Sequence, residues 1–297
     1  MLGYLILSTA VAVLPQSGRT DTTIAVRPGT RVSVANAGGE VVVRSWDRSE
    51  VRVRAEHSSR AGVALNLEGS VLRIEARSTR GRGPAMAGVV DYDITVPART
   101  AIEIGGMYAD VTLEGTRGDV RVNTIEGDLS VRGAEGTISL TTINGDIDVR
   151  GARGRVELRS TSDDIFAEDV EGELTAETVS GDIELRRINV SRLEAQTVSG
   201  DVTFTGTIRN DGSYVLVTHS GDVVAGIPEG SNVTVRAAVA SGDVETEFPV
   251  TAGERQNRRR QTFRIGTGSA TLDMETFSGD IRLVRPASVS PRRGREN

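Results

Sequence analysis

From Gly118 to residue 189 the sequence consists of eight consecutive nine-residue blocks, seven of which begin with glycine and one with aspartate. Small or apolar residues stand two, four and often seven positions after the first residue of a block. Examples are Leu129, Val131 and Ala134, Ile138, Leu140 and Ile143, and Leu174, Ala176 and Val179. The spacing of two places the first two positions on one face of a β-strand, and the spacing typical of an amphipathic helix is missing. We predict a strand in each block and a core formed by all three positions.

Alternate blocks resemble each other more than neighbouring blocks do, so the structural unit is a pair of nine-residue blocks. Its most regular part is the motif T-φ-[SN]-G-D, in which φ is apolar. The glycines of this motif are Gly127, Gly145, Gly181, Gly200, Gly221, Gly242 and Gly279. We expect them to form tight turns, because glycine adopts positive φ angles without steric cost. The distance between successive motifs increases toward the C-terminus and is largest before the last motif, which indicates that later coils carry loops.

Short strands joined by regular turns predict a chain that winds around one axis. We predict a single-domain, all-β fold, namely a β-solenoid (β-helix-like) with coils of about 18–21 residues, capped by irregular β-strands at both ends. One coil buries too little apolar surface to offset the entropy of ordering its backbone, so the coils must stack. The predicted parts are a signal peptide (1–20), an N-terminal strand and capping region (21–110), the regular solenoid (111–285) with a hairpin insertion near 250–264, and a disordered basic tail (286–297).

The composition excludes several classes of site. The chain has no Cys, which rules out disulfides, thiolate nucleophiles, thiolate zinc sites and Fe–S clusters. Two His and ten aromatic residues (one Trp, four Tyr and five Phe) leave little material for His-based catalysis or for aromatic platforms that stack on bases or on glycan rings. A net charge of −6 argues against nucleic acid as a partner.

Residues 2–14 are an apolar run that is too short to span a bilayer. Ala10 and Ala12 give the small-x-small pattern of a signal-peptide cleavage site. We predict a secretory signal and export to the periplasm or the extracellular space, and the alternative is a buried first strand. No second apolar run is long enough to cross a membrane, so no transmembrane span is predicted.

Several segments resemble the bacterial putative-adhesin family of β-strand-repeat (S-G-D repeat) proteins, a domain of unknown function. They are the T-V-S-G-D-I-x-L repeats, the segment GGEVVVRSWDRSEVRVRA (38–55), YDITVP (92–97) and GSATLDMETFSGDIRL (268–283). The resemblance covers about residues 24–285. Two corners depart from it: residues 106–110 (GMYAD) lack S-G-D, and Ser162-Asp163-Asp164 lacks the glycine. The resemblance implies a location at the cell envelope and no catalytic residues.

Eight aspartates end the motif: Asp128, Asp146, Asp164, Asp182, Asp201, Asp222, Asp243 and Asp280. In stacked coils they would form a ladder with a spacing of about 4.8 Å, at which neighbouring carboxylates repel each other by roughly 1 kcal/mol in water. Two interpretations account for such a ladder. In the favoured one, each carboxylate caps amides of its own turn, together with Ser and Thr hydroxyls. In the other, Ca²⁺ lies between the coils; no other cofactor is predicted.

Three groups of residues could indicate an enzyme. Asp163 and Asp164 are adjacent in a strand and point to opposite faces, so they cannot converge. Asp91 and Asp93 can share a face, as in a polysaccharide hydrolase or lyase, but the sequence shows no basic or aromatic lining for them. His219, Ser220 and Asp222 are the residue types of a catalytic triad. They occupy positions of the repeat, however, so we interpret His219 as a substituted repeat residue.

Two further features have a structural and a functional interpretation. Trp46 lies beside a turn and is more typical of a packing residue than of a sugar-stacking platform. Arg258, Arg259 and Arg260 form the basic tip of a predicted hairpin, which is normally solvated; the alternative is contact with an anionic envelope polymer or with lipid headgroups.

We therefore predict a non-catalytic, exported cell-envelope protein, adhesin-like, that presents a repetitive surface rich in hydroxyls and carboxylates. Its partner would be an envelope or extracellular polymer or protein, bound by many weak contacts, and weak self-association is an option. Two alternatives stay open. One is a β-helix enzyme acting on polysaccharides (a lyase or hydrolase), and the other is an envelope-stress or regulatory component.

Overall fold

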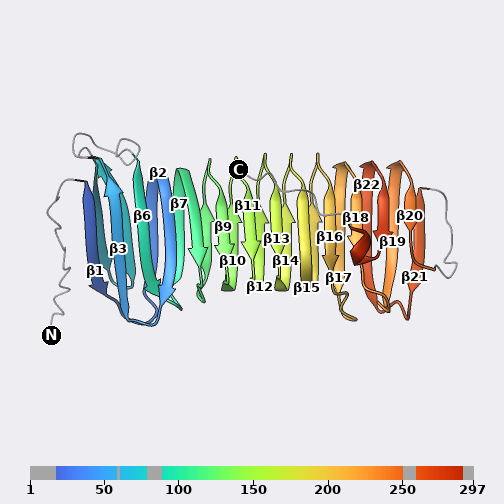
Figure 1. Ribbon diagram of the computed structural model, residues 1–297, viewed down its shortest axis with the longest axis horizontal. Coiled ribbons are helices and arrows are strands. Elements are labelled where there is room, and N and C mark those ends of the chain that lie inside the picture. Colours follow the sequence, from blue (N-terminus) through green and yellow to red (C-terminus); the bar gives the residue numbers. More distant parts are fainter. Residues whose placement is uncertain (1–17, 59–60, 79–88, 250–258, 290–297) are drawn as a thin grey trace, which may run out of the picture. The chain divides into compact units, whose positions relative to one another are not determined.

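The computed structural model describes residues 18–58, 61–78, 89–249 and 259–289. The chain divides into two compact units, Met1–Gly145 (unit 1) and Asp146–Asn297 (unit 2), where the sequence predicted a single domain. The described residues form 23 strands and one short 3₁₀ helix. Within each unit most strand pairs are parallel (Figure 1). The prediction of an all-β fold made of repeated parallel strands is therefore confirmed.

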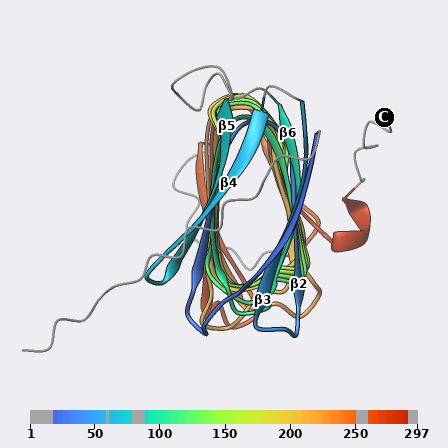
Figure 2. The same ribbon diagram turned by 90° about the vertical axis from the view of Figure 1, so that its left-hand side faces the viewer.

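Unit 1 holds ten strands, which form two facing walls (Figure 2). They are β1 (Arg19–Ala25), β2 (Arg31–Trp46), β3 (Glu50–His57), β4 (Ala61–Glu68), β5 (Val71–Ser78), β6 (Val90–Pro97), β7 (Ala101–Glu114), β8 (Val120–Asn123), β9 (Leu129–Arg132) and β10 (Glu135–Thr141). Partners in its regular parallel pairs are separated along the chain by two blocks, as in Ile102 opposite Val120 and Val120 opposite Ile138. The two-block unit of the sequence is thus the separation between hydrogen-bonded strands.

The first coils of unit 1 do not follow each other in chain order. Strand β2 pairs in parallel with β7 on one side and with both β5 and β6 on the other, so the earliest coil lies inside later ones. Strand β3 pairs antiparallel with β6, and β4 pairs antiparallel with β5. Strand β1 in turn pairs antiparallel with β3. The order of the coils in space therefore differs here from their order in the chain. After β3 turns back it leaves a gap one strand wide, and β6 fills that gap and satisfies the backbone groups on both sides.

Unit 2 holds thirteen strands and the 3₁₀ helix. They are β11 (Ile147–Arg150), β12 (Arg153–Arg159), β13 (Ile165–Glu168), β14 (Glu171–Glu177), β15 (Ile183–Gln196), β16 (Val202–Gly206), β17 (Ser213–Ser220), β18 (Val223–Gly226), β19 (Val233–Ser241), β20 (Val244–Thr246), β21 (Arg260–Ile265), β22 (Ala270–Ser278), β23 (Ile281–Val284) and η2 (Pro286–Ser288). Ile147, Ile165, Ile183 and Val202 are successive partners, which matches the spacing of the corner motifs in the sequence.

The last coil of unit 2 is also inserted out of order. Strand β22 pairs in parallel with β17 and with β19, and β23 pairs with β18 and with β20 (Figure 1). The antiparallel strand β21 lies against β19 and closes that sheet edge. The order of the coils in space differs from their order in the chain at this end too, because β22 lies between β17 and β19. The described part of the predicted hairpin insertion is β21, and residues 250–258 lie outside the described residues.

The core consists of alternate strand residues. The position seven residues after the start of a block, also predicted as core, is buried in some blocks and exposed in others. Ala134 and Ala152 are buried as predicted, but Ile143 and Val179 are 45% and 46% exposed. The inward alternation of the strand continues to the threonine of the corner motif, so the apolar residue after it points outward. Several buried motif threonines of unit 2 donate across coils, as Thr197 Oγ1 does to the Gly181 oxygen at 2.9 Å and Thr218 Oγ1 to the Gly200 oxygen at 2.8 Å. This pairing removes the cost of burying their hydroxyls.

The structure describes a part of each predicted terminal segment. Strand β1 begins at Arg19, within the range predicted as a signal peptide, and residues 1–17 lie outside the described residues. Residues 286–289, predicted as part of a disordered tail, are ordered because Glu247 Oε2 accepts hydrogen bonds from the Arg285 N–H (2.9 Å) and the Ser288 hydroxyl (3.1 Å). Residues 290–297 are outside the described residues. In the part of the chain that the structure describes, no helix has the length and apolar character needed to cross a membrane.

Candidate interaction surface

Aspartates at the corners form hydrogen-bonded pairs between adjacent coils, in which a backbone N–H donates to an Oδ1, and in unit 2 these pairs form a ladder. In unit 1, Asp128 donates in this way to Asp110, at the corner of residues 106–110, at 2.9 Å. In unit 2 the donor–acceptor pairs are Asp164–Asp146 (3.1 Å), Asp182–Asp164 (2.8 Å), Asp201–Asp182 (2.8 Å), Asp222–Asp201 (2.9 Å), Asp280–Asp222 (2.9 Å) and Asp243–Asp280 (3.0 Å). The sequence predicted that each carboxylate caps amides of its own turn; the structure shows that its Oδ1 also accepts an amide proton from the adjacent coil. Charge-assisted bonds of this kind offset the repulsion between neighbouring carboxylates.

The motif glycines allow this close stacking of corners. A Cβ atom at any of them would lie 2.0–2.3 Å from a backbone carbonyl oxygen of the adjacent coil. The positions are Gly127, Gly145, Gly181, Gly200, Gly221, Gly242 and Gly279. Asp163 replaces glycine in one motif. Gly181 of the next coil still packs closely on it, because a Cβ atom at Gly181 would lie 2.3 Å from the backbone oxygen of Asp163. The loss of glycine at this corner therefore does not change how the next coil lies on it.

A metal in the ladder stays a prediction. In the described ranges, no group of three or more His, Asp or Glu side chains could hold a metal ion. The Oδ1 atoms of the ladder already accept amide protons, which favours the hydrogen-bonded interpretation.

Asp201→Ala tests the two interpretations of the ladder. We expect it to lower the free energy of unfolding by about 1–2 kcal/mol, because the Asp222 N–H loses its acceptor. Asp201→Asn should restore most of that loss, since its amide oxygen can accept the same bond. Urea unfolding of the three proteins measures these losses, and thermal unfolding of the wild type with and without EDTA measures the effect of chelation. A fall of several degrees in the melting temperature of the wild type on chelation would establish the Ca²⁺ interpretation instead.

The same corners carry an unexpected row of exposed apolar side chains. Eight large apolar side chains are exposed among the described residues, and seven of them lie at corners, the exception being Val89. They are Met107, Tyr108, Ile125 and Ile143 in unit 1, and Val179, Val198 and Phe277 in unit 2. Scattered apolar residues are normal on a surface, but such a concentration at one repeat position marks a candidate interaction site.

In unit 2 the strand register aligns these side chains across adjacent coils. Val179 follows the Glu177–Gln196 pair, and Val198 precedes the bridge between Ser199 and Ser220. His219 lies beside Phe277, and their rings stack with centroids 4.8 Å apart and an interplanar angle of 8°. We call Val179, Val198, His219 and Phe277 the apolar ladder. Exposed serines follow each of its members, namely Ser180, Ser199, Ser220 and Ser278.

The sequence therefore predicted a surface of hydroxyls and carboxylates and missed its apolar component. The signal was present, because Leu174, Ala176 and Thr178 alternate inward and so direct Val179 outward. Counting every apolar residue as core concealed it.

Asp91 and Asp93, the pair considered for the alternative of an enzyme, both contact neighbouring residues on the surface of unit 1. The two aspartates line a groove of unit 1, in which Asp93 lies 3.3 Å from the Arg44 guanidinium and 3.8 Å from that of Arg54. Basic residues therefore do line this groove, although the sequence showed no basic lining for the pair. Asp91 Oδ1 accepts the Glu40 N–H at 2.9 Å. Each carboxylate of the pair thus has a structural partner in unit 1.

The remaining predicted residues have structural contacts. Asp222 forms an ion pair with Arg282, and its Oδ1 accepts the Asp280 N–H at 2.9 Å, while His219 stacks on Phe277. The Trp46 ring donates to the Glu50 oxygen at 2.7 Å and lies 5.0 Å below the Arg48 guanidinium. Thr178 donates to the backbone oxygen of Asp163 at 3.1 Å. Arg259 and Arg260 are exposed, and Arg258 lies outside the described residues.

A family model matches the part of the chain that contains the repeats. The chain belongs to the family described as Toastrack DUF4097, whose model matches residues 30–284, and this confirms the family resemblance of the S-G-D repeats. The chain is similar to the crystal structure of a putative adhesin from Bacteroides fragilis NCTC 9343, with 14% identity, coverage of 92% of this chain and 100% of that chain, and a TM-score of 0.44. A putative adhesin from Parabacteroides merdae ATCC 43184 gives 9% identity, coverage of 90% and 97%, and a TM-score of 0.44. The comparison with curated proteins finds no match.

Proposed function

We propose that this protein is a non-catalytic, exported binding protein of the cell envelope. In this proposal each unit is a β-solenoid whose corners contact an envelope or extracellular polymer or protein. The observation that carries the proposal is the concentration of exposed apolar side chains at the corners, where seven of the eight in the described residues lie.

The physical support is that these side chains recur although each leaves a large part of its area exposed. Phe277 is 57% exposed and Val198 47%, so much of their apolar area stays in water, and covering it with a partner would gain about 25 cal/mol for each Å². In unit 2 a serine and an aspartate of the same motif accompany Val179, Val198 and Phe277, so these coils present the same polar groups. A repeated site of this kind binds by adding many weak contacts, which suits a polymer or a second repetitive surface. The apolar run at residues 2–14 supports export.

The test is a binding screen with the full chain against purified cell-wall fragments and a glycan panel, with and without Ca²⁺. The variant Val179→Ser/Val198→Ser/Phe277→Ser should weaken binding of any ligand found by about tenfold or more, since three apolar contacts are lost. Val215→Ser is the matched control, because Val215 is an outward, half-buried valine in the middle of β17 of the same unit and not at a corner. Equal affinities of the triple variant and the wild type would refute the proposed surface.

A further inference from the structure

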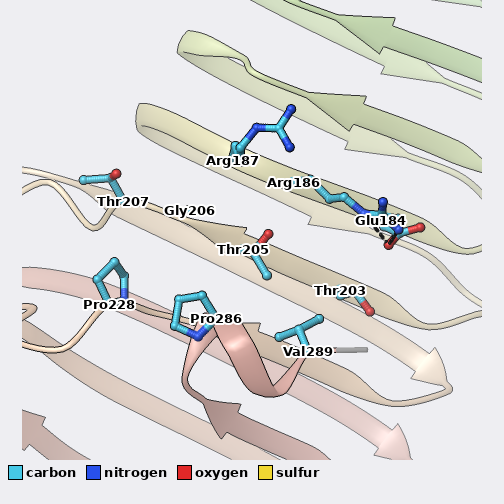
Figure 3. A pocket seen from close by; sticks show the side chains of 10 residues that line it. All are labelled: Glu184, Arg186, Arg187, Thr203, Thr205, Gly206, Thr207, Pro228, Pro286 and Val289. Carbon is cyan, nitrogen blue, oxygen red and sulfur yellow. Dashed lines mark hydrogen bonds and ion pairs between the residues drawn. The ribbon is translucent and has the colours of Figure 1, made fainter. Parts of the chain in front are cut away.

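A groove of 520 Å³ lies in unit 2, on the outer face of β15 and β16 (Figure 3). Its floor holds Glu184 and Arg186 on β15 and Thr203 and Thr205 on β16, with Glu184 opposite Thr203 in the register. Because alternate residues of a strand share a face, these two positions on each strand give four polar side chains on one face. The groove does not include the apolar ladder, so it is a separate site.

The charged groups of this groove neutralise each other. Arg186 donates through Nε to Glu184 Oε1 at 2.8 Å, and its guanidinium lies 5.2 Å from the centre of the Phe166 ring, which fixes its plane. Arg187, at the rim, lies 2.8 Å from Glu168 and 2.7 Å from Asp169. The hydrogen bonds from Arg187 hold the pKa of the Asp169 carboxyl below its usual value. Because each of these charges already has a partner of opposite sign, the groove favours a neutral ligand.

The polar groups still have bonding capacity toward a ligand. The Thr203 hydroxyl makes no hydrogen bond to another described residue, and Thr205 Oγ1 reaches only the Leu185 oxygen at 3.4 Å. Carboxylate oxygens keep lone pairs beyond the ion pair, and a guanidinium has five N–H donors. Donors and acceptors therefore alternate over a short distance, which suits a ligand with several hydroxyl groups.

The opposite wall is apolar and is built by the end of the described chain. Pro286 and Val289 face the groove, and they approach β18 closely because Gly226 has no side chain: a Cβ there would lie 2.8 Å from Val289 Cγ2. Glu247 holds this segment through the Arg285 N–H, and that bond lowers the pKa of the Glu247 carboxyl. The groove thus combines an apolar wall with a polar floor, the pairing that fits the C–H face and the hydroxyls of a sugar ring.

We propose that this groove binds a neutral oligosaccharide, with Thr203, Thr205 and the Glu184–Arg186 pair contacting its hydroxyls and with Pro286 and Val289 against a ring face. The inference does not depend on the function proposed for the corners.

The test is titration of the full chain with chitotetraose, cellotetraose and inorganic phosphate, followed by calorimetry. At least one of the two neutral tetrasaccharides should bind saturably with a Kd of about 1 mM or lower, and phosphate should not. Thr203→Val/Thr205→Val keeps the shape of both residues and should weaken binding by about fivefold or more, because two hydroxyl contacts are lost. Thr175→Val is the matched control, an outward threonine on β14 outside the groove.

Val289→Ser provides a second variant outside the strands and should also weaken binding. The proposal is overturned if neither tetrasaccharide binds at about ten times that concentration, or if phosphate binds in their place. It is equally overturned if the double threonine variant binds as the wild type does, or if Thr175→Val loses as much as that variant. Loss of tetrasaccharide binding in the triple apolar-ladder variant alone would assign the sugar to the corners and not to the groove.

Discussion

Gly221→Ala should lower the free energy of unfolding by about 3 kcal/mol or more and the melting temperature by about 6–12 °C. Gly221 has a φ of +150°, and a Cβ there would lie 2.1 Å from the Gly200 oxygen and 2.6 Å from its carbon. The new methyl group would push the corner of one coil off the next. The stacking of backbones through these corners, more than the freedom of glycine itself, is the reason for the large effect. Differential scanning calorimetry measures it.

Gly230→Ala separates the two contributions. Gly230 also has a positive φ, +82°, but nothing lies within 4 Å of its Cβ position. We expect a loss of only about 1 kcal/mol there, from the backbone conformation alone. Similar losses in both variants would mean that the close approach of coils at Gly221 contributes little, contrary to the stacking described above.

Leu272→Ala should lower the free energy of unfolding by about 2–5 kcal/mol and expose strands on both of its sides to hydrogen exchange. Leu272 is fully buried in β22 and lies opposite Tyr214 of β17 and Val235 of β19. Because β22 fills the gap between those strands, loosening it should reduce amide protection in β17 and in β19 together. Hydrogen-exchange mass spectrometry of the native protein measures the amide protection of both strands.

Phe263→Ala is the control for the inserted coil. Phe263 is buried in the edge strand β21, opposite Val235 of β19, and β21 pairs with no strand on its other side among those described. Its loss should reduce protection in β19 and β21 and leave β17 unchanged. If Leu272→Ala instead spared β17, the last coil would lie outside the stack, as chain order alone would predict.

Much of the fold could be predicted because the information is local. Residues such as Ile147, Ile165 and Ile183 recur once in every two blocks, and the structure pairs them as neighbours. The turn glycines and the aspartates after them follow from the same repeat. The contact partner of each aspartate did not follow, because a carboxylate can reach the amide of its own turn or that of the next coil, and only the stacking distance chooses between them.

The candidate sites were harder to predict than the fold. The apolar ladder could have been found, because strand alternation directs Val179 outward once Thr178 is inward. The groove could not, since its floor comes from β15 and β16 and its wall from Pro286 and Val289, far later in the chain. No periodicity connects residues that meet across a fold.

The sequence by itself determined the strands, the length of the coil and the residue types at each corner, because these depend on side-chain alternation and on turn conformation within a few residues. Only the tertiary structure decided the order of the coils, with β2 inside β5 and β6 and with β22 between β17 and β19. The physical reason is that every strand presents the same alternating pattern and the same backbone groups. Which strand fills which gap is therefore decided by long-range pairing that leaves no backbone group unsatisfied, and not by any local preference.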